Sequence, residues 1–217
     1  MEENINIEQL VNWLNIFMTE ATNTIENLLA SEVIQGTIEL SNSLASAIDT
    51  LNTLKKIASI PSKLYLRKFE KFCRGLASIP LDKRKKYVKT LGREKFSQES
   101  VFILNVINRI EEEDKLPLLI KLLDARCGNE ISAEEYRRLT VMVDRTLYSD
   151  LLYLKHSITD DPVELRTDSD YGLAASGLLV TAGSTWLTFE VPTKDTGICF
   201  NYTLSAKKIA KICFNTT

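Results

Sequence analysis

Residues that could carry out acid–base, nucleophilic or metal chemistry are few and scattered in this 217-residue chain. It has one histidine, His156, and four cysteines without a Cys-x-x-Cys pair, so a zinc site would need ligands from distant segments. The sequence also lacks Gly-x-Ser-x-Gly, His-Glu-x-x-His and a phosphate-binding glycine loop. We therefore predict no catalytic residue, no metal site, no cofactor and no enzymatic activity.

Four consecutive acids at residues 111–114 are the densest group of potential ligands. On a helix, consecutive side chains point in different directions around the axis, so these carboxylates could not converge on one ion. We interpret them as a solvated junction between two helices. We assign His156 a structural role at the C-terminal end of a long helix, where a partial positive charge is favourable. We predict that the four cysteines are reduced, mostly buried thiols: Cys73, Cys127, Cys199 and Cys213.

Charge is distributed unevenly along the chain, although the net charge is only −2. Residues 1–54 hold eight acids and no base, and residues 55–95 hold fourteen bases against three acids. The remaining residues hold thirteen bases against eighteen acids. An acidic arm, a basic middle and a mildly acidic remainder therefore follow one another.

A basic segment in the middle of the chain is the one feature that suggests a charged partner. Lys85, Lys89 and Arg93 are four residues apart, which predicts one face of a helix. Such a face could bind nucleic-acid phosphates, another protein or anionic lipid, or it could be solvated or neutralised by the acidic arm. The candidate partner-binding residues are Lys83, Arg84, Lys85, Lys86, Lys89, Arg93 and Lys95.

Residues 1–56 are predicted to form an acidic, amphipathic helical arm. Its apolar residues recur at steps of three and four, as on one face of a helix. That face could pack within the chain, or it could form a seam with a second copy and make a homo-oligomer. The candidate oligomer-interface residues are Ile7, Leu10, Leu14, Phe17 and Leu28.

Residues 57–160 are predicted to form a helical bundle with a basic face. A helix should begin after Pro61, and a short second helix should be capped by Asp82 and end at Gly92. Ser97 should cap a third helix, which is apolar nearly all round and therefore suits the centre of a bundle.

The second half of this bundle should contain two further helices. The first has Pro117 in its first turn, and Gly128 is expected just after its last turn. Ser132 and Glu135 match a capping box, which predicts a long helix that reaches about His156. Its buried stripe should include Tyr136, Leu139, Val143, Leu147, Leu151 and Leu154.

Residues 161–217 are predicted to form a small α+β domain that is winged-helix-like. A short helix over 167–176 ends at Gly177, strands over 178–191 and 198–204 form a β-hairpin, and Ser205 caps a last helix. The helix before the hairpin contains Asp168 and Asp170 and no base, so docking or dimerisation is favoured over reading of DNA.

Neither export nor membrane insertion is expected from the sequence. The acidic start of the chain lacks the basic and apolar regions of a secretory signal. Residues 171–189 are uncharged, but glycine, serine and threonine interrupt them, so we predict no transmembrane segment. A cytoplasmic protein is the expectation.

The middle and end of the chain resemble bacterial and prophage proteins of the abortive-infection alpha family. The resemblance covers about residues 55–210, and it rests on the patterning around Ile57-Ala58-Ser59-Ile60-Pro61, the helix over 69–76 and Ser132-Ala133-Glu134-Glu135-Tyr136-Arg137-Arg138-Leu139. The family combines a helical middle with a winged-helix-like tail, and no site residue can be carried over from it. The resemblance implies phage defence, or a prophage-encoded counter-defence or immunity function.

Taken together, these features predict a mainly α protein: a helical bundle followed by a winged-helix-like domain. The first functional hypothesis is a non-enzymatic protein-interaction module in the conflict between bacteria and phages, whose partner is another protein or a second copy. The alternative is a nucleic-acid-binding regulator that uses the basic segment over residues 83–95.

Overall fold

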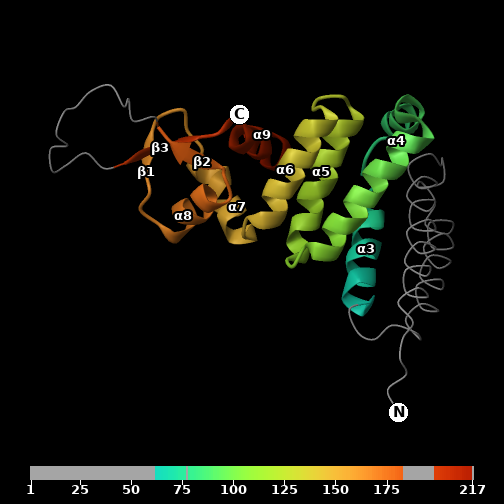
Figure 1. The fold of residues 1–217 in the computed structure, drawn as a ribbon, viewed down its shortest axis with the longest axis horizontal. Helices are drawn as coiled ribbons and strands as arrows, with labels where there is room; N and C mark the ends of the chain where they lie inside the picture. Colours follow the sequence, from blue (N-terminus) through green and yellow to red (C-terminus); the bar gives the residue numbers. More distant parts are fainter. Residues whose placement is uncertain (1–61, 77, 183–197, 217) are drawn as a thin grey trace, which may run out of the picture. The chain divides into compact units, whose positions relative to one another are not determined.

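The computed structural model describes residues 62–76, 78–182 and 198–216, which are mainly helical with a small antiparallel sheet near the C-terminus (Figure 1). The arm over 1–56, with its candidates Ile7, Leu10, Leu14, Phe17 and Leu28, lies outside the described residues, as does most of the predicted strand over 178–191.

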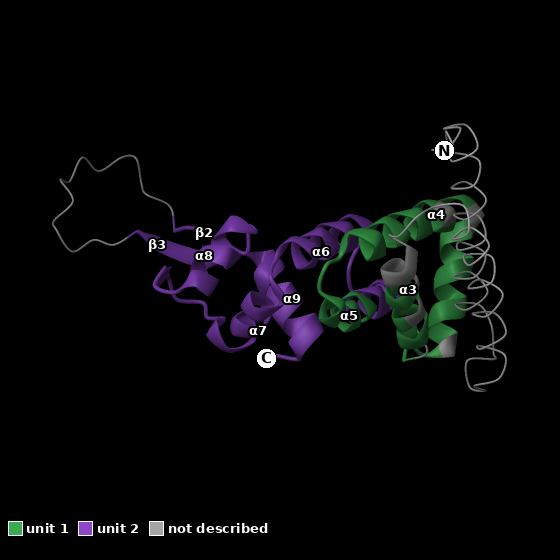
Figure 2. Cartoon of the chain, turned by 90° about the horizontal axis from the view of Figure 1, so that it is seen from below, with its two compact units in different colours: residues 1–120 green, residues 121–217 purple. Residues whose placement is uncertain are grey.

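The chain divides into two compact units, residues 1–120 and residues 121–217 (Figure 2). The division falls inside one helix, α5 (Leu116–Cys127). The domain boundary that was predicted at residue 160 lies within the second unit.

In the first unit, α3 (Ser62–Leu76) is followed by α4 (Leu81–Arg109) and a 3-10 turn, η2 (Glu113–Lys115). In amphipathic α3, four apolar residues are fully buried: Phe69, Phe72, Cys73 and Leu76. The apolar second half of α4 is also largely buried, which supports its predicted place in the core: Ile103, Leu104, Val106, Ile107 and Ile110.

Gly92 interrupts α4, but the two predicted caps around it are wrong. Gly92 has φ 69° and ψ 165°, a conformation that only glycine adopts readily, so the helix breaks there as predicted. Pro80 occupies the N-cap position, and Asp82 lies inside the first turn instead of capping it. The helix resumes directly after Gly92, so Ser97 lies within helical structure and not at its start.

The end of α5 differs from the prediction by one residue. Asn129, and not Gly128, adopts the left-handed conformation, with φ 58°. The Glu130 N–H donates to the Ala125 carbonyl at 2.9 Å, and the Asn129 N–H donates to the Arg126 carbonyl at 3.1 Å. This pattern closes a helix end around a left-handed residue, and asparagine tolerates that conformation better than most non-glycine residues.

The predicted long helix is two helices in the second unit, α6 (Ala133–Arg145) and α7 (Tyr148–Ser157). Thr146 and Leu147 between them have extended backbones, and the Thr146 hydroxyl donates to the Met142 carbonyl at 2.7 Å. The break places Leu147 at 60 % exposure, so its predicted burial is wrong, whereas Leu151 and Leu154 are fully buried.

The C-terminal part contains β1 (Val163–Glu164), α8 (Asp168–Ala175), β2 (Leu179–Thr181), β3 (Cys199–Tyr202) and α9 (Leu204–Phe214). The sheet order is β1-β3-β2, and both pairs are antiparallel, with Leu179 opposite Tyr202 and Val163 opposite Phe200.

The ends of α8 match the prediction, whereas the start of α9 does not. Thr167 and Asp170 form a capping box at the start of α8, and Gly177 beyond its end has φ 79°. The N-cap of α9 is Thr203, whose hydroxyl accepts the Ala206 N–H at 3.1 Å, and not the predicted Ser205. The buried core of this C-terminal part contains Leu173, Leu178, Ile209 and Cys213.

None of the helices in the described ranges combines the length and the apolar composition needed to cross a lipid bilayer. Of the cysteines, Cys73, Cys127 and Cys213 are buried as predicted, and Cys199 is partly exposed.

Candidate functional site

The basic segment of α4 divides into exposed and buried residues. Lys86, Lys89 and Lys95 are exposed, and Lys83 and Lys85 are partly buried. Arg84 is only 3 % exposed, and its Nε donates to the Ile79 carbonyl at 2.9 Å. Arg84 is therefore part of the fold of the first unit, and its predicted role in binding a partner stays a prediction.

Gly92 also alters the predicted geometry of this segment. Residues four apart share a face only while the backbone between them stays helical. Gly92 has a non-helical backbone and lies between Lys89 and Arg93. Lys85 and Lys89 remain in phase on the first part of α4, and the non-helical backbone of Gly92 separates them from the residues that follow it.

Part of the positive charge of α3 is paired within the first unit. The Arg67 guanidinium donates to the Glu113 carboxylate at 3.0 and 3.1 Å, and Lys71 lies 3.8 Å from an Asp114 oxygen. The Lys68 ammonium is buried and donates to the Asn108 and Ile110 carbonyls at the end of α4, at 2.9 and 2.8 Å. These acids therefore act as ion-pair partners of α3, which is a more specific role than the predicted solvated junction.

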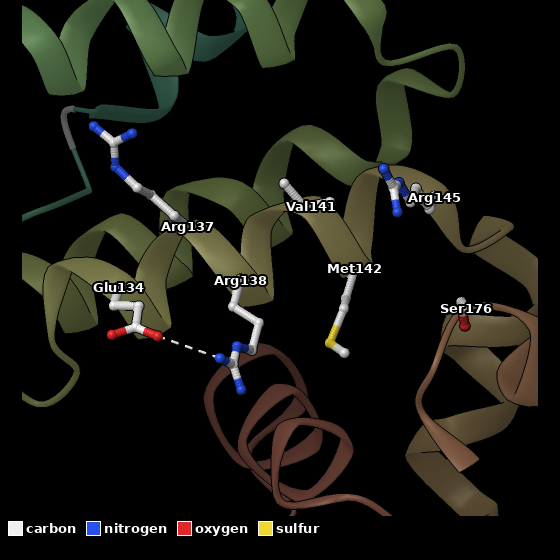
Figure 3. A pocket seen from close by; sticks show the side chains of 7 residues that line it. All are labelled: Glu134, Arg137, Arg138, Val141, Met142, Arg145 and Ser176. Atoms are coloured by element: carbon white, nitrogen blue, oxygen red, sulfur yellow. Dashed lines mark hydrogen bonds and ion pairs between the residues drawn. The ribbon is translucent and has the colours of Figure 1, made fainter. Parts of the chain in front are cut away.

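A second basic surface, which was not predicted from the sequence, lies on the outer face of α6 (Figure 3). It borders an open groove of about 440 Å³ within the second unit. We call it the α6 groove, and it is lined by Glu134, Arg137, Arg138, Val141, Met142, Arg145 and Ser176.

The position of the α6 groove follows from how α6 packs. Its buried face consists of Tyr136, Leu139, Thr140 and Val143, so residues out of phase with them point outward. Figure 3 shows Arg137 and Val141 along one side of this outer face, and Glu134, Arg138 and Met142 along the other. All three arginines are exposed, whereas Val141 and Met142 are partly buried between them. The surface therefore combines a basic rim with an apolar centre.

One acid reduces the charge of the α6 groove. Arg138 Nη2 lies 3.3 Å from Glu134 Oε1, one helical turn away. The charged side chains that line the groove are thus three arginines and one glutamate, a sum of two positive charges.

The start of α6 is fixed by two sets of contacts. The Glu135 N–H donates to the Ser132 hydroxyl at 3.1 Å, and the Ser132 N–H donates to the Glu135 carboxylate at 2.9 Å, which is the predicted capping box. Lys208 of α9 also donates to the Glu135 carboxylate. The hydrogen bond from Lys208, together with those from Ser132, lowers the pKa of Glu135 from 4.5 to about 2. Glu135 therefore stays ionised and links α6 to α9.

Two buried carboxylates, Asp150 of α7 and Asp170 of α8, lie in the described core. Asp150 accepts a hydrogen bond from the Ser169 hydroxyl at 2.8 Å, and a Cβ on Gly172 would lie 2.1 Å from an Asp150 oxygen. Asp170 accepts from the Arg166 and Thr167 N–H groups at 3.0 and 2.8 Å. Although burial opposes it, these hydrogen bonds lower the pKa of Asp170. Since their oxygens serve hydrogen bonds of the fold, we assign both carboxylates a structural role.

A smaller groove of about 260 Å³ lies beside α9, where Lys207 forms an ion pair with Asp160. The hydrogen bond from Lys207 lowers the pKa of Asp160, which favours the ionised form of this carboxyl group. Among the described residues, no three histidine, cysteine, aspartate or glutamate side chains come together as a potential metal site.

The α6 groove left a signal in the sequence that could have been used. Val141 and Met142 are apolar but do not belong to the predicted buried stripe, and arginines flank them. Two apolar residues on the polar face of an amphipathic helix are a sign of a contact surface.

No protein-family model, curated protein sequence or solved structure gives a significant match to this chain.

Proposed function

We propose that this protein is a non-enzymatic interaction module in the conflict between bacteria and phages, as a defence factor or as its prophage-encoded counterpart. The observation that carries the interaction role is the α6 groove, where exposed arginines surround partly exposed apolar side chains. Protein interfaces favour this combination, because arginine and methionine are enriched in them and lysine is depleted. The phage context is supported by the resemblance of residues 55–210 to the abortive-infection alpha family.

We also propose that the C-terminal elements form a winged-helix-like domain that docks proteins. The sheet order β1-β3-β2, with α8 before the β2–β3 pair and α9 after it, is consistent with this arrangement. In such a domain α8 would be the helix that enters a DNA groove, but it contains Asp168 and Asp170 and no base. Because acids repel phosphate, a docking role is favoured over DNA recognition.

Nucleic-acid binding through the basic segment of α4 is the competing function. Exposed Lys86, Lys89 and Lys95 favour it, whereas buried Arg84 and the interruption at Gly92 count against it. Titration of the full chain with labelled duplex DNA and single-stranded RNA over a salt series separates the two functions. Phosphate contacts weaken steeply with salt. We expect no binding even at low salt, and tight salt-dependent binding that is lost in Lys86→Glu/Lys89→Glu would contradict the proposed function.

The proposed function is tested by expressing the full chain in a bacterial host and measuring the plating of a panel of phages. We expect the plating of at least one phage to fall if the protein is a defence factor, or to be restored in a defended host if it is the counterpart. Arg137→Glu/Arg145→Glu should abolish the effect. Lys155→Glu/Arg166→Glu, an equal charge change at exposed residues outside the α6 groove, should retain it. Unchanged plating in both settings would contradict the phage role.

Self-association through the arm over residues 1–56 remains part of the proposal. Light scattering of the full chain should give more than one copy per particle, and Leu10→Asp/Leu14→Asp should reduce the mass to one copy, because charge in an apolar seam is unfavourable. If the unsubstituted chain is a monomer, the proposed self-association is wrong.

A further inference from the structure

We propose that the α6 groove binds an acidic, amphipathic helix of a partner protein. This inference rests on the proposed function and deepens it by naming the chemistry of the partner. It follows from the charge of the groove, its apolar centre and the spacing of its arginines. Each of these features restricts the chemistry or the shape of the ligand.

The charged residues of the groove select an anionic ligand. Arg137, Arg138 and Arg145 are exposed on one helix, and Glu134, which pairs with Arg138, is the acid among the residues that line the groove. A guanidinium presents its N–H groups as a fixed fork that matches a carboxylate with two parallel hydrogen bonds. An acidic segment therefore fits this surface better than a neutral or basic one.

The apolar centre selects a peptide over a polyphosphate. Val141 and Met142 are partly exposed between the arginines, and Met142 lies close enough to Gly177 that a Cβ there would be 3.6 Å from the Met142 methyl. A flexible thioether adapts its shape to apolar side chains of a partner. The groove lining contains no aromatic residue on which a base could stack, which single-stranded nucleic-acid sites commonly use.

The C-terminal end of α8 adds a further restriction. Ser176, which lines the groove, is the C-cap of α8, and its N–H donates to the Gly172 carbonyl at 3.1 Å. A helix C-terminus carries partial negative charge, so this end of the groove suits the unpaired N–H groups at the N-terminus of a partner helix, and the carboxylates of that helix belong at the arginines.

The spacing of the arginines fits a helical ligand. Arg137 and Arg145 are eight residues apart on one helix, which corresponds to about 12 Å along its axis. Two carboxylates eight residues apart on a partner helix span the same length, with apolar residues of that helix facing Val141 and Met142 between them. This is the helix-in-groove mode of peptide recognition.

The test is fluorescence anisotropy of the full chain with designed probes. The first probe is a labelled 20-residue amphipathic helix with a leucine stripe flanked by glutamates, and the second replaces every glutamate by lysine. A labelled single-stranded DNA is the third. We expect binding of the glutamate peptide only.

Variants then locate the binding surface. Arg137→Glu/Arg145→Glu should weaken binding of the glutamate peptide by at least about tenfold, since loss of interfacial charge pairs costs that much or more. Arg137→Gln/Arg145→Gln, which is milder, should give an intermediate loss, and Met142→Asp should also weaken binding. The control Lys155→Glu/Arg166→Glu should stay within about twofold, because charges distant from a contact are screened by salt. Circular dichroism establishes that each variant is folded.

Three results would overturn the inference: binding of the lysine peptide as tightly as the glutamate peptide, equal loss in the control variant, or DNA binding that the α6 substitutions remove. Failure of the proposed function would give a different pattern of results from failure of the peptide site. If the glutamate peptide binds as expected but phage plating never changes, the peptide site stands and the phage role falls. If plating depends on α6 but the glutamate peptide does not bind, the interaction module stands and the acidic helix is excluded.

Discussion

Two helices of this protein, α4 and α6, carry basic residues and use them differently. On α4 the bases are mostly lysines, Arg84 is buried against the Ile79 carbonyl, and Gly92 interrupts the helical phase. On α6 three arginines are exposed along one uninterrupted helix, around Val141 and Met142. The density of bases in a sequence therefore does not locate a basic surface, because packing and backbone phase decide which side chains are presented together.

The largest expected effect is at Arg84, where a base of α4 acts as a structural residue. Arg84→Ala removes a buried stem and leaves the Ile79 carbonyl without this donor, so we expect a loss of about 2–3 kcal/mol in the free energy of unfolding. Urea denaturation measures it. Lys86→Ala, at an exposed neighbour, should change the free energy of unfolding by less than about 0.5 kcal/mol. Equal effects at the two positions would remove the distinction within α4.

Gly92→Ala should have the next largest effect. The φ of 69° and ψ of 165° are disfavoured for any residue with a Cβ, even though, apart from the adjacent backbone, nothing lies within 4 Å of the added methyl group. We expect a loss of about 1–2 kcal/mol in the free energy of unfolding by urea denaturation. Thr90→Ala, at an exposed position of the same helix, is the control and should change the free energy of unfolding little. A stabilised Gly92→Ala protein would indicate that α4 prefers to be continuous.

On α6, loss of the capping box should lower the free energy of unfolding by less than the two changes on α4. Ser132→Ala removes the hydroxyl that accepts the Glu135 N–H, and we expect a cost of about 1 kcal/mol in the free energy of unfolding. Ser149→Ala, at an exposed serine in the first turn of α7, should be nearly neutral. If the two serines behave alike, the capping box does not stabilise the helix that presents the arginines.

The smallest expected effect is a pH dependence at Glu135. The pKa of this carboxyl is about 2 in the folded protein, against 4.5 ordinarily, because Lys208 and Ser132 stabilise its charged form. A depressed pKa contributes stability above the ordinary value, and that contribution is lost as the pH falls from about 4.5 through about 2.

An NMR titration of the Glu135 carboxyl carbon checks this. Lys208→Met should raise the midpoint toward the ordinary value, whereas Lys207→Met, whose ammonium pairs with Asp160, should leave it unchanged. A midpoint that is insensitive to Lys208→Met would exclude the link between α6 and α9.

Local signals in the sequence predicted some helix ends correctly, whereas the predicted caps at Asp82, Ser97 and Ser205 were wrong. The capping box at Ser132 and Glu135, the helix end at Gly177 and the break at Gly92 are all confirmed. In each case a side chain or a glycine acts on its own backbone, so a few consecutive residues contain the cause.

The elements that were missed depend on tertiary contacts. The break at Thr146 and Leu147 contains neither glycine nor proline, so no local signal marks it. It separates α6 from α7, and each helix has its own buried face. Strand β1 has only two residues, and its pairing with β3 comes from far along the chain. Burial of Arg84 is also invisible in a run of bases, because it depends on the path of the chain around Ile79. The α6 groove was missed for the same reason, since exposure of Val141 and Met142 follows from the packing of α6.

The central claim is that the protein presents its partner surface on α6 and not on α4. The most direct test is the affinity of the full chain for the glutamate peptide, measured side by side for Arg137→Glu/Arg145→Glu and Lys86→Glu/Lys89→Glu, which change the charge equally. We predict a loss of at least about tenfold for the α6 variant and less than about twofold for the α4 variant. An equal or larger loss for the α4 variant would contradict the account.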